Sequence, residues 1–312
     1  MNKILSMVVL VASLYFASIA SANPVTGLPI NVLGTAYEQA MTTNQAIMNR
    51  TSLLNKSKTD GFSLWAEGGT KFLNRTDNSG YYGNISGMAV GGDYRFNEDF
   101  AVGLGAGYSK ARSEGTGNYG DIVNNSNLGG FEAYGQWSPN EWNFVLDAGY
   151  YWGKSEISNI RNAKNQKYYS GIFTTGLKVE YLFENEVVNL LPYAGFRYSR
   201  INSDVQHMNF IEVPLGIMFY REGTLVDDWK FKPYMDLGYT FYAGDMDVTN
   251  EMWQDGKKVK YHDNFMDYGR MHGTLGCKFY KDDDLSFNVY AKHEHSNNFS
   301  NTSINAGFAY LF

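Results

Sequence analysis

From residue 61 to the end of the chain, hydrophobic and polar positions alternate with a period of two. The last ten residues show the pattern most clearly, with an apolar row made of Ile304, Ala306, Phe308, Tyr310 and Phe312. Successive side chains of a strand point to opposite faces, so this period predicts β-structure. Clusters of Gly, Asn and Asp interrupt the alternation and predict hairpin connections. We predict about twelve strands, at 61–72, 83–96, 99–112, 127–138, 141–155, 168–184, 188–201, 208–221, 229–243, 265–280, 284–296 and 301–312.

The lengths of the strands and of their connections indicate a barrel that crosses a membrane. Each strand has at least the roughly 9–11 residues that a tilted strand needs to span a bilayer. Long connections at 73–82, 113–126 and 156–167 alternate with short ones at 97–98, 139–140 and 185–187. This alternation is typical of an antiparallel outer-membrane barrel, although 222–228 and 297–300 fit it less well. An even number of strands places the first strand's start and Phe312 on the same, periplasmic, side.

The two faces of the strands differ in chemistry. One face carries aliphatic residues with aromatic residues towards the ends, as in the row from Trp142 to Trp152, which is typical of a lipid-facing band. The other face carries charges of both signs, which would each cost several kcal/mol against lipid and would be costly unpaired in a dry core. We therefore predict a hydrated lumen lined by Glu67, Asp93, Arg95, Glu132, Asp147, Lys178, Glu180, Arg197, Lys232, Asp236, Arg270 and Lys278.

The first sixty residues are predicted to hold three further segments. Residues 1–22 have one positive charge, a short apolar run and an Ala-Ser-Ala end, which are the parts of a secretory signal. Residues 23–34 form a short linker, and a helix is expected over 35–58, with Thr35 and Glu38 as a capping box. The helix is polar all round, so we expect it to thread through the lumen of the barrel at 59–312; a solvated linker helix is the alternative.

Composition excludes several classes of function. The chain has 33 Gly, 24 Tyr and 20 Phe but 1 Cys, which suits a sheet with bulk outside and small residues inside. The balance of 26 Lys+Arg against 32 Asp+Glu argues against nucleic-acid binding. No cofactor or metal is expected, because the two histidines that share a face, His293 and His295, have no motif around them. His295 and Ser296 are adjacent and point to opposite faces, so we also expect no enzyme.

Several motifs, in their order along the chain, resemble the autotransporter β-domain. They are G-F-S-L-W-A-E-G-G at 61–69, A-V-G-G-D-Y-R-F at 89–96, A-V-G-L-G-A-G-Y-S at 101–109, L-L-P-Y-A-G-F-R-Y at 190–198, F-K-P-Y-M-D-L-G-Y at 231–239 and A-G-F-A-Y-L-F at 306–312. The resemblance covers about 35–312. It implies an all-β, twelve-stranded, up-and-down transmembrane barrel with the helix in its pore, and a terminal strand whose Phe308, Tyr310 and Phe312 form an insertion signal.

The resemblance also implies outer-membrane lipid and the barrel-assembly machinery as partners, and we expect a monomer in the outer membrane. Autotransporters carry a passenger between signal and helix, but here that interval is only 23–34. We therefore expect type V secretion machinery whose cargo is absent or lost. Members that cut their own passenger do so at an Asn-Asn pair, which residues 35–58 lack. A small-solute pore or an adhesin that uses its surface loops remains the alternative.

Overall fold

The computed structural model describes residues 24–55, 60–77, 80–115, 122–158, 165–225, 228–254, 257–281 and 284–312. The side chains of 24–27 and 250–263 lie outside this description, as does the predicted signal at 1–22. Among the described helices, none is long and apolar enough to cross a membrane.

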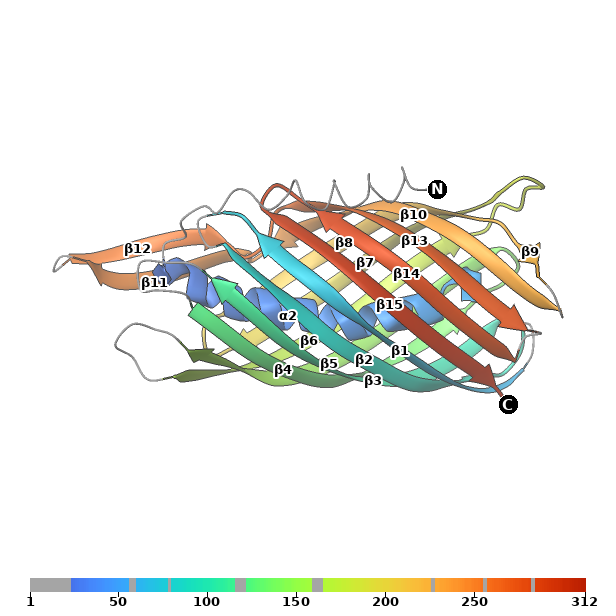
Figure 1. The fold of residues 1–312 in the computed structure, drawn as a ribbon, viewed down its shortest axis with the longest axis horizontal. Coiled ribbons are helices and arrows are strands. Elements are labelled where there is room, and N and C mark those ends of the chain that lie inside the picture. The colour runs from blue at the N-terminus through green and yellow to red at the C-terminus, as the bar shows by residue number, and fades with distance from the viewer. Residues whose placement is uncertain are drawn as a thin grey trace, which may run out of the picture.

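Twelve long strands of the described chain close into a barrel, with each strand antiparallel to both neighbours (Figure 1). The strands are β1 (Gly61–Arg75), β2 (Tyr81–Arg95), β3 (Phe100–Gly115), β4 (Ile122–Trp137), β5 (Trp142–Ser158), β6 (Gln166–Tyr181), β7 (Asn189–Ser203), β8 (His207–Tyr220), β10 (Trp229–Gly244), β13 (Gly269–Lys281), β14 (Leu285–His295) and β15 (Phe299–Leu311). The last strand pairs with the first, from Ser63 opposite Leu311 to Arg75 opposite Phe299. All twelve predicted strands are therefore present, and the predicted fold class is confirmed.

Three short strands complete the sheet structure. Strand β9 (Gly223–Thr224) pairs with the start of β10. Strands β11 (Asp247–Gln254) and β12 (Lys257–Asn264) form a hairpin that extends beyond the barrel wall (Figure 1). The sequence predicts one long connection at 244–264, and the structure shows that this connection contains the hairpin. We call the end of the barrel with this hairpin the hairpin end, and the other end the Phe312 end.

A single helix of the described chain, α2 (Pro24–Arg50), runs through the barrel and is followed by a 3-10 turn at Leu53–Asn55 (Figure 1). It begins about eleven residues before the expected start, so the linker predicted at 23–34 is wrong from Pro24 onward. Pro29 and Gly34 are poor helix formers, but Ile30, Val32 and Leu33 are fully buried in the lumen. Burial of these apolar side chains outweighs the weak local propensity.

Thr35 is consequently not a helix cap. It lies in the middle of α2, where its hydroxyl is 3.1 Å from that of Ser113. The other half of the predicted capping box, Glu38, binds cations on the barrel wall instead of a backbone amide. The capping prediction failed because the same Thr-x-x-Glu spacing also suits two polar side chains one turn apart.

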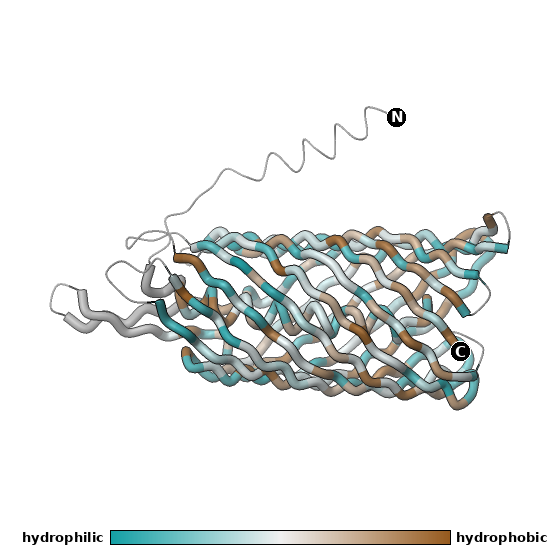
Figure 2. The backbone as a smooth tube through the Cα atoms, turned by 60° about the horizontal axis from the view of Figure 1, so that its bottom comes forward, coloured by the Kyte–Doolittle hydropathy of each residue, from teal (hydrophilic) through white to brown (hydrophobic). Residues whose placement is uncertain are grey.

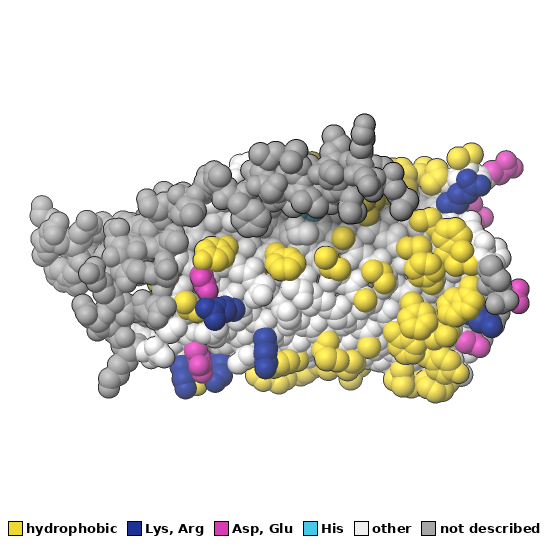
Figure 3. Space-filling model, viewed as in Figure 1, with side chains coloured by type: hydrophobic (Ala, Val, Ile, Leu, Met, Phe, Trp, Pro, Cys, Tyr) yellow, Lys and Arg dark blue, Asp and Glu magenta, His cyan; other side chains and the backbone are white. Residues whose placement is uncertain are grey.

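The outer face of the barrel is the predicted apolar one. In the row from Trp142 to Trp152, Leu146, Ala148 and Tyr150 are exposed, while the residues between them are buried. Figure 2 shows hydropathy changing along the strands of the wall, and Figure 3 shows apolar side chains gathered on the wall, most densely towards the Phe312 end. The polar residues thus face inward, where α2 lies.

Candidate functional site

The hairpin-end half of α2 is bound to strands β3 and β4 by neutral hydrogen bonds. The Asn31 carboxamide oxygen accepts from Ser113 Oγ at 2.7 Å and from Asn124 Nδ2 at 2.8 Å. Ser126 Oγ donates to Gln39 Oε1 at 2.6 Å. All of these groups are buried, and a buried polar group without a partner would cost about 1–3 kcal/mol. The helix and this part of the wall therefore satisfy most of each other's polar groups, although Asn31 Nδ2 and Asn124 Oδ1 are buried without a hydrogen-bond partner among the described residues.

Close approach of the helix to β3 depends on a glycine. A Cβ at Gly107 would lie 1.9 Å from Thr43 Oγ1, which is inside any allowed contact. The glycine-rich inner faces noted in the sequence thus make room for α2, and the helix packs against β2, β3 and β4 in preference to the opposite wall.

In the middle of the lumen, a carboxylate of the wall accepts from the helix. Asn44 Nδ2 donates to Glu132 Oε1 at 2.7 Å, and Tyr151 donates to the other oxygen of Glu132. Glu132 is fully buried. Beside it, Asp147 and Arg197 form a bidentate pair at 2.7 and 2.9 Å. The hydrogen bond between Asn44 and Glu132 fixes the rotation of α2 about its axis.

The Phe312 end of the helix is held by two further carboxylates. Arg50 makes a bidentate ion pair with Asp93 at 2.8 and 2.9 Å. Glu180 accepts from Leu53 N at 2.8 Å, from Ser52 Oγ at 3.0 Å and from Lys178 Nζ at 2.6 Å. Because bidentate and charge-assisted bonds are the stronger ones, the chain is bound tightly just before it enters β1.

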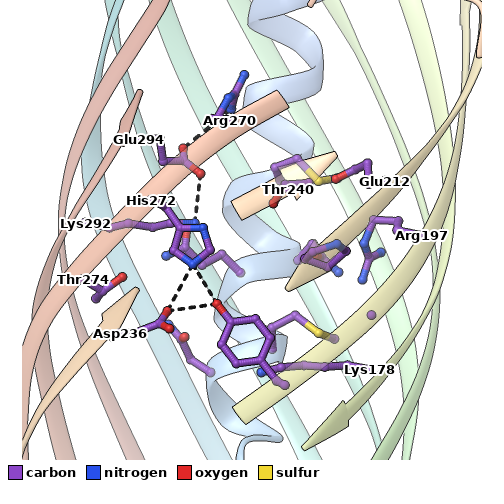
Figure 4. Close-up of a pocket in the computed structure, with 18 of the residues that line it drawn as sticks. Lys178, Arg197, Glu212, Asp236, Thr240, Arg270, His272, Thr274, Lys292 and Glu294 are labelled. Atoms are coloured by element: carbon purple, nitrogen blue, oxygen red, sulfur yellow. Dashed lines mark hydrogen bonds and ion pairs between the residues drawn. The ribbon is translucent and has the colours of Figure 1, made fainter. Parts of the chain in front are cut away.

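A cluster of charges lies on the side of α2 that faces β1, β13 and β14. Glu38 accepts from Lys71 at 2.9 Å and from Arg270 at 2.8 Å. Glu294 lies 3.6 Å from Lys71 and 3.7 Å from Arg270, and it pairs with Lys292 at 2.9 Å. Figure 4 shows Arg270, Glu294 and Lys292 together beside the helix. Charges of both signs are therefore neutralised across the gap between helix and wall.

A cavity of about 210 Å³ remains between α2 and strands β6 to β14 (Figure 4). At about 30 Å³ per water it has room for roughly seven water molecules. On its wall, Tyr193 OH lies 2.7 Å and Asp236 Oδ2 lies 3.3 Å from His272 Nε2, and Lys178 lies over the Tyr193 ring. Within the described residues, no group of three His, Cys, Asp or Glu side chains is placed to hold a metal. The cavity is a gap beside the helix, lined by both polar and apolar side chains.

Aromatic residues close the lumen at the hairpin end. The ring of Tyr37 on α2 meets those of Phe210 and Phe265 edge-on, with centroids 5.3 and 5.9 Å apart. Arg75 donates to the carbonyls of Phe265 at 2.7 Å and of Asn264 at 2.6 Å. The base of the β11–β12 hairpin is thereby fixed against the middle of the helix, at Tyr37.

The connection from this hairpin to β13 is bound to the neighbouring connection. Asp267 accepts from the backbone N of Asn298 at 2.9 Å and from its side chain at 2.8 Å. Burial alone would raise the pKa of Asp267, but the hydrogen bonds from Ser296 and Asn298 outweigh it and hold that pKa below its ordinary value. The two connections are thus held together at neutral pH.

The structure places all twelve sequence-predicted lumen residues on the inner wall. Of those not described above, Glu67 binds Asn49 and Tyr290. Lys278 donates to Leu54 O at 3.5 Å, and Lys232 lies 3.4 Å from Glu222. Arg95 donates to the Glu98 carbonyl and to Gln136.

Sequence reasoning missed the helix side of these interactions, and it also missed Lys71. This lysine has the strand parity of Glu67, four residues earlier, which could have revealed it. The three residues of the expected insertion signal, Phe308, Tyr310 and Phe312, lie exposed on the outer wall.

Comparison with known proteins identifies the family. The autotransporter beta-domain family matches residues 64–292. The translocator domain of the autotransporter NalP from Neisseria meningitidis superposes with a TM-score of 0.68 at 12% identity, covering 90% of this chain and 97% of that one. The β-domain of the Bordetella autotransporter BrkA gives 0.61 at 17% identity, covering 81% and 100%.

Two further results complete the comparison. The transport unit of AIDA-I from Escherichia coli gives a TM-score of 0.59 at 14% identity, covering 87% of this chain and 98% of that one. A search of curated protein sequences found no match. Because the family match extends over more than half of the chain and the fold is the same, this protein belongs to the autotransporter beta-domain family and is a bacterial outer-membrane β-barrel.

Proposed function

We propose that this barrel is a translocator of the kind that secretes and anchors a passenger, that its cargo is absent or lost, and that α2 closes the pore. The observation that supports this most is the course of the helix, which follows the lumen from the hairpin end to the start of β1 (Figure 1). A chain passing through the barrel would take the same path. The ion pairs and hydrogen bonds at Asn31, Asn44 and Arg50 would then hold its last part in place.

The remaining parts of the proposal follow from the sequence. Residues 1–22 would direct export as a cleaved signal, and the row ending in Phe312 would be recognised by the barrel-assembly machinery. The protein would be a monomer in outer-membrane lipid, with the hairpin end outside and the Phe312 end in the periplasm. It would act by secretion and anchoring, without catalysis.

Planar-bilayer conductance tests the closed pore. The full chain should conduct weakly, because α2 fills the lumen and only the cavity of about 210 Å³ is left beside it. Deletion of residues 24–55 should raise single-channel conductance several-fold, since the wall is charged and hydrated once the helix is gone.

Two controls make the comparison decisive. A heat-dependent shift in gel mobility must show that both proteins form closed barrels. Substitution of Gln45, a helix residue on the cavity, by Ala should leave conductance low. Equal conductance of the full chain and the deletion variant would contradict the proposal.

The cavity favours one alternative, a small-solute pore that works with the helix in place. Its lining includes Lys178, Arg197 and Glu212, which could guide ions. In that case the full chain would already conduct, and Lys178→Glu would change its ion selectivity. Under the translocator proposal, the same substitution leaves the low conductance of the full chain unchanged.

A further inference from the structure

Two histidines lie side by side on the outer face of β14, near the hairpin end. His293 and His295 are exposed, and their rings are parallel to within 11°, with centroids 6.4 Å apart. They occupy alternate positions of one strand, so both side chains point to the same face. A metal ion bound to a ring nitrogen at about 2.0–2.1 Å stands roughly 3 Å from the ring centroid. These two rings can therefore share one ion once their nitrogens turn towards each other.

Thr302 on β15 orients one of the two rings. Its hydroxyl oxygen lies 2.9 Å from Nδ1 of His293. When Nδ1 donates its proton to that oxygen, the lone pair of Nε2 is left free for a ligand. Metal-binding histidines almost always make such a bond from the nitrogen that does not bind the ion. Because Nδ1 faces β15, Nε2 faces the other way, towards β13, the neighbour on the opposite side of β14.

The surface on that side of His293 is open, because its partner on β13 is Gly273. Apart from the neighbours in the chain, a Cβ at Gly273 would meet a methyl group of Leu237 at 3.6 Å and no other described atom within 4 Å. By contrast, Gly269 in the same row is covered, since a Cβ there would collide with the hydroxyl of Tyr239. The space next to the His293 ring is thus available to a ligand.

A thioether lies beside this open space. Met271 is 60% exposed and is the register partner of His295. Side chains directly opposite each other on antiparallel strands have Cβ atoms about 4.5–5.5 Å apart, and diagonal neighbours lie roughly 7–8 Å apart, within reach of long side chains. Met271 is opposite one histidine and diagonal to the other, and its side chain is flexible. Its sulfur can therefore approach the same ion over Gly273.

The donor set is neutral and partly soft. No Asp or Glu occupies an outward position in the described parts of β13, β14 and β15. Carboxylates suit Mg²⁺, Ca²⁺ and Mn²⁺, whereas imidazole binds copper well and thioethers select copper(I). A monovalent ion also brings the least charge next to the apolar row of β14, which includes Val289 and Ala291. This chemistry favours a soft, singly charged ion.

We propose that His293, His295 and Met271 bind one copper(I) ion on the outer wall of the barrel. The sequence shows no motif around the two histidines, because the thioether and the hydroxyl of Thr302 come from neighbouring strands. The site lies outside the lumen, so it is independent of the closed pore.

Competition for copper(I) tests the site in the full chain. Metal-free protein in neutral detergent micelles, kept anaerobic with ascorbate, is titrated against a chromophoric copper(I) chelator, and the absorbance of the chelate reports the copper transferred. We expect the protein to hold one ion that His293→Gln and His295→Gln each weaken at least tenfold. Met271→Leu should weaken copper(I) about tenfold but leave the binding of nickel(II) unchanged, because nickel(II) gains little from a thioether.

Matched variants separate this site from other histidines and methionines of the chain. Met88→Leu on β2, which is 57% exposed on the outer wall, and His207→Gln, an exposed histidine at the start of β8, should keep wild-type binding. Gly273→Val fills the open space and keeps all three ligands, since a Cβ there makes only an ordinary contact. It should weaken copper(I) about tenfold. Heat-dependent gel mobility shows that each variant forms a closed barrel.

Some results would overturn the site. Unchanged copper binding in both histidine variants would do so, as would tighter binding of nickel(II) than of copper(I), or full copper binding by both Met271→Leu and Gly273→Val. Should one histidine variant fail to fold, the other decides. The conductance of these variants should stay low whatever the copper result, so a failure of metal binding is distinct from a failure of the closed pore.

Discussion

Several buried charges stabilise this protein by joining the helix to the barrel wall. Glu38 is an example, since it lies between Lys71 and Arg270 and is 2% exposed. Removing one member of such a group leaves the others buried without full compensation, which costs about 3–5 kcal/mol. An exposed pair contributes about 0–1 kcal/mol.

We therefore expect Glu38→Gln to lower the free energy of unfolding by about 3 kcal/mol. The carboxamide cannot neutralise Lys71 and Arg270, and Glu294, which already pairs with Lys292, is left as the one carboxylate of the described chain close to both. Urea unfolding in detergent micelles, followed by tryptophan fluorescence, measures the change.

The matched control is Glu222→Gln. Glu222 lies 3.4 Å from both Lys230 and Lys232 but is well exposed, so its loss should change stability by less than about 1 kcal/mol. Similar effects of the two substitutions would show that burial of the Glu38 group contributes nothing.

At the scale of single residues, the sequence predicts which strand side chains face the lumen but not which helix residues they contact. The parity of two along each strand is enough to place residues such as Glu132 and Arg197 inside. That Asn44 meets Glu132 depends on how α2 is rotated and how far it is inserted, which no local pattern records. For the same reason Glu38 was interpreted as part of a helix cap.

Among the elements, the strands were predictable because their two faces contact such different surroundings, lipid outside and polar groups inside. The start of α2 was not, because Pro29 and Gly34 are locally unfavourable and the burial of Ile30 and Leu33 is a tertiary effect. The β11–β12 hairpin did leave a signal, the Asp-Gly pair at 255–256 within an alternating segment. It was missed because loops of outer-membrane barrels are commonly long.

The base of this hairpin should control access to the lumen. Phe265 is buried against Tyr37 and Phe210, and replacing a buried Phe by Ala costs about 3–5 kcal/mol. In Phe265→Ala we expect amide hydrogen exchange in residues 30–40 to become at least a hundredfold faster, because the hairpin end opens more often. Mass spectrometry of peptides from this part of α2 measures the rate.

Phe241→Ala is the control, since Phe241 is exposed on the outer wall of β10 and touches no part of the helix face described above. Its exchange in residues 30–40 should match that of the unmodified protein. A hairpin that does not close the lumen would leave the exchange of Phe265→Ala unchanged as well.

For the whole molecule, the decisive contact is the pairing of β1 with β15. Phe312 N donates to Phe62 O at 2.9 Å, and the two rings stack with centroids 6.2 Å apart. The Phe312 side chain is nevertheless exposed, so it contributes little to the stability of the finished barrel. Its exposure suits recognition during assembly.

Phe312→Ala should therefore refold in detergent with a yield close to that of the unmodified protein, but its assembly into the outer membrane of cells should fall several-fold. Ile304→Ala, an exposed residue earlier in the same row, should assemble normally. Heat-dependent gel mobility of membrane fractions measures both. Normal assembly of Phe312→Ala would contradict a terminal insertion signal.

The β1–β15 pairing also sets the order of events during folding. It joins positions separated by nearly the whole barrel sequence, so it carries the largest loop-closure entropy of any strand pair. The hairpin pairs from β1 to β8 are local and can form first, and they include the strands on which α2 packs most closely. The helix can thus pack against an open sheet made of the first strands, and pairing of the last strands then closes the barrel around it.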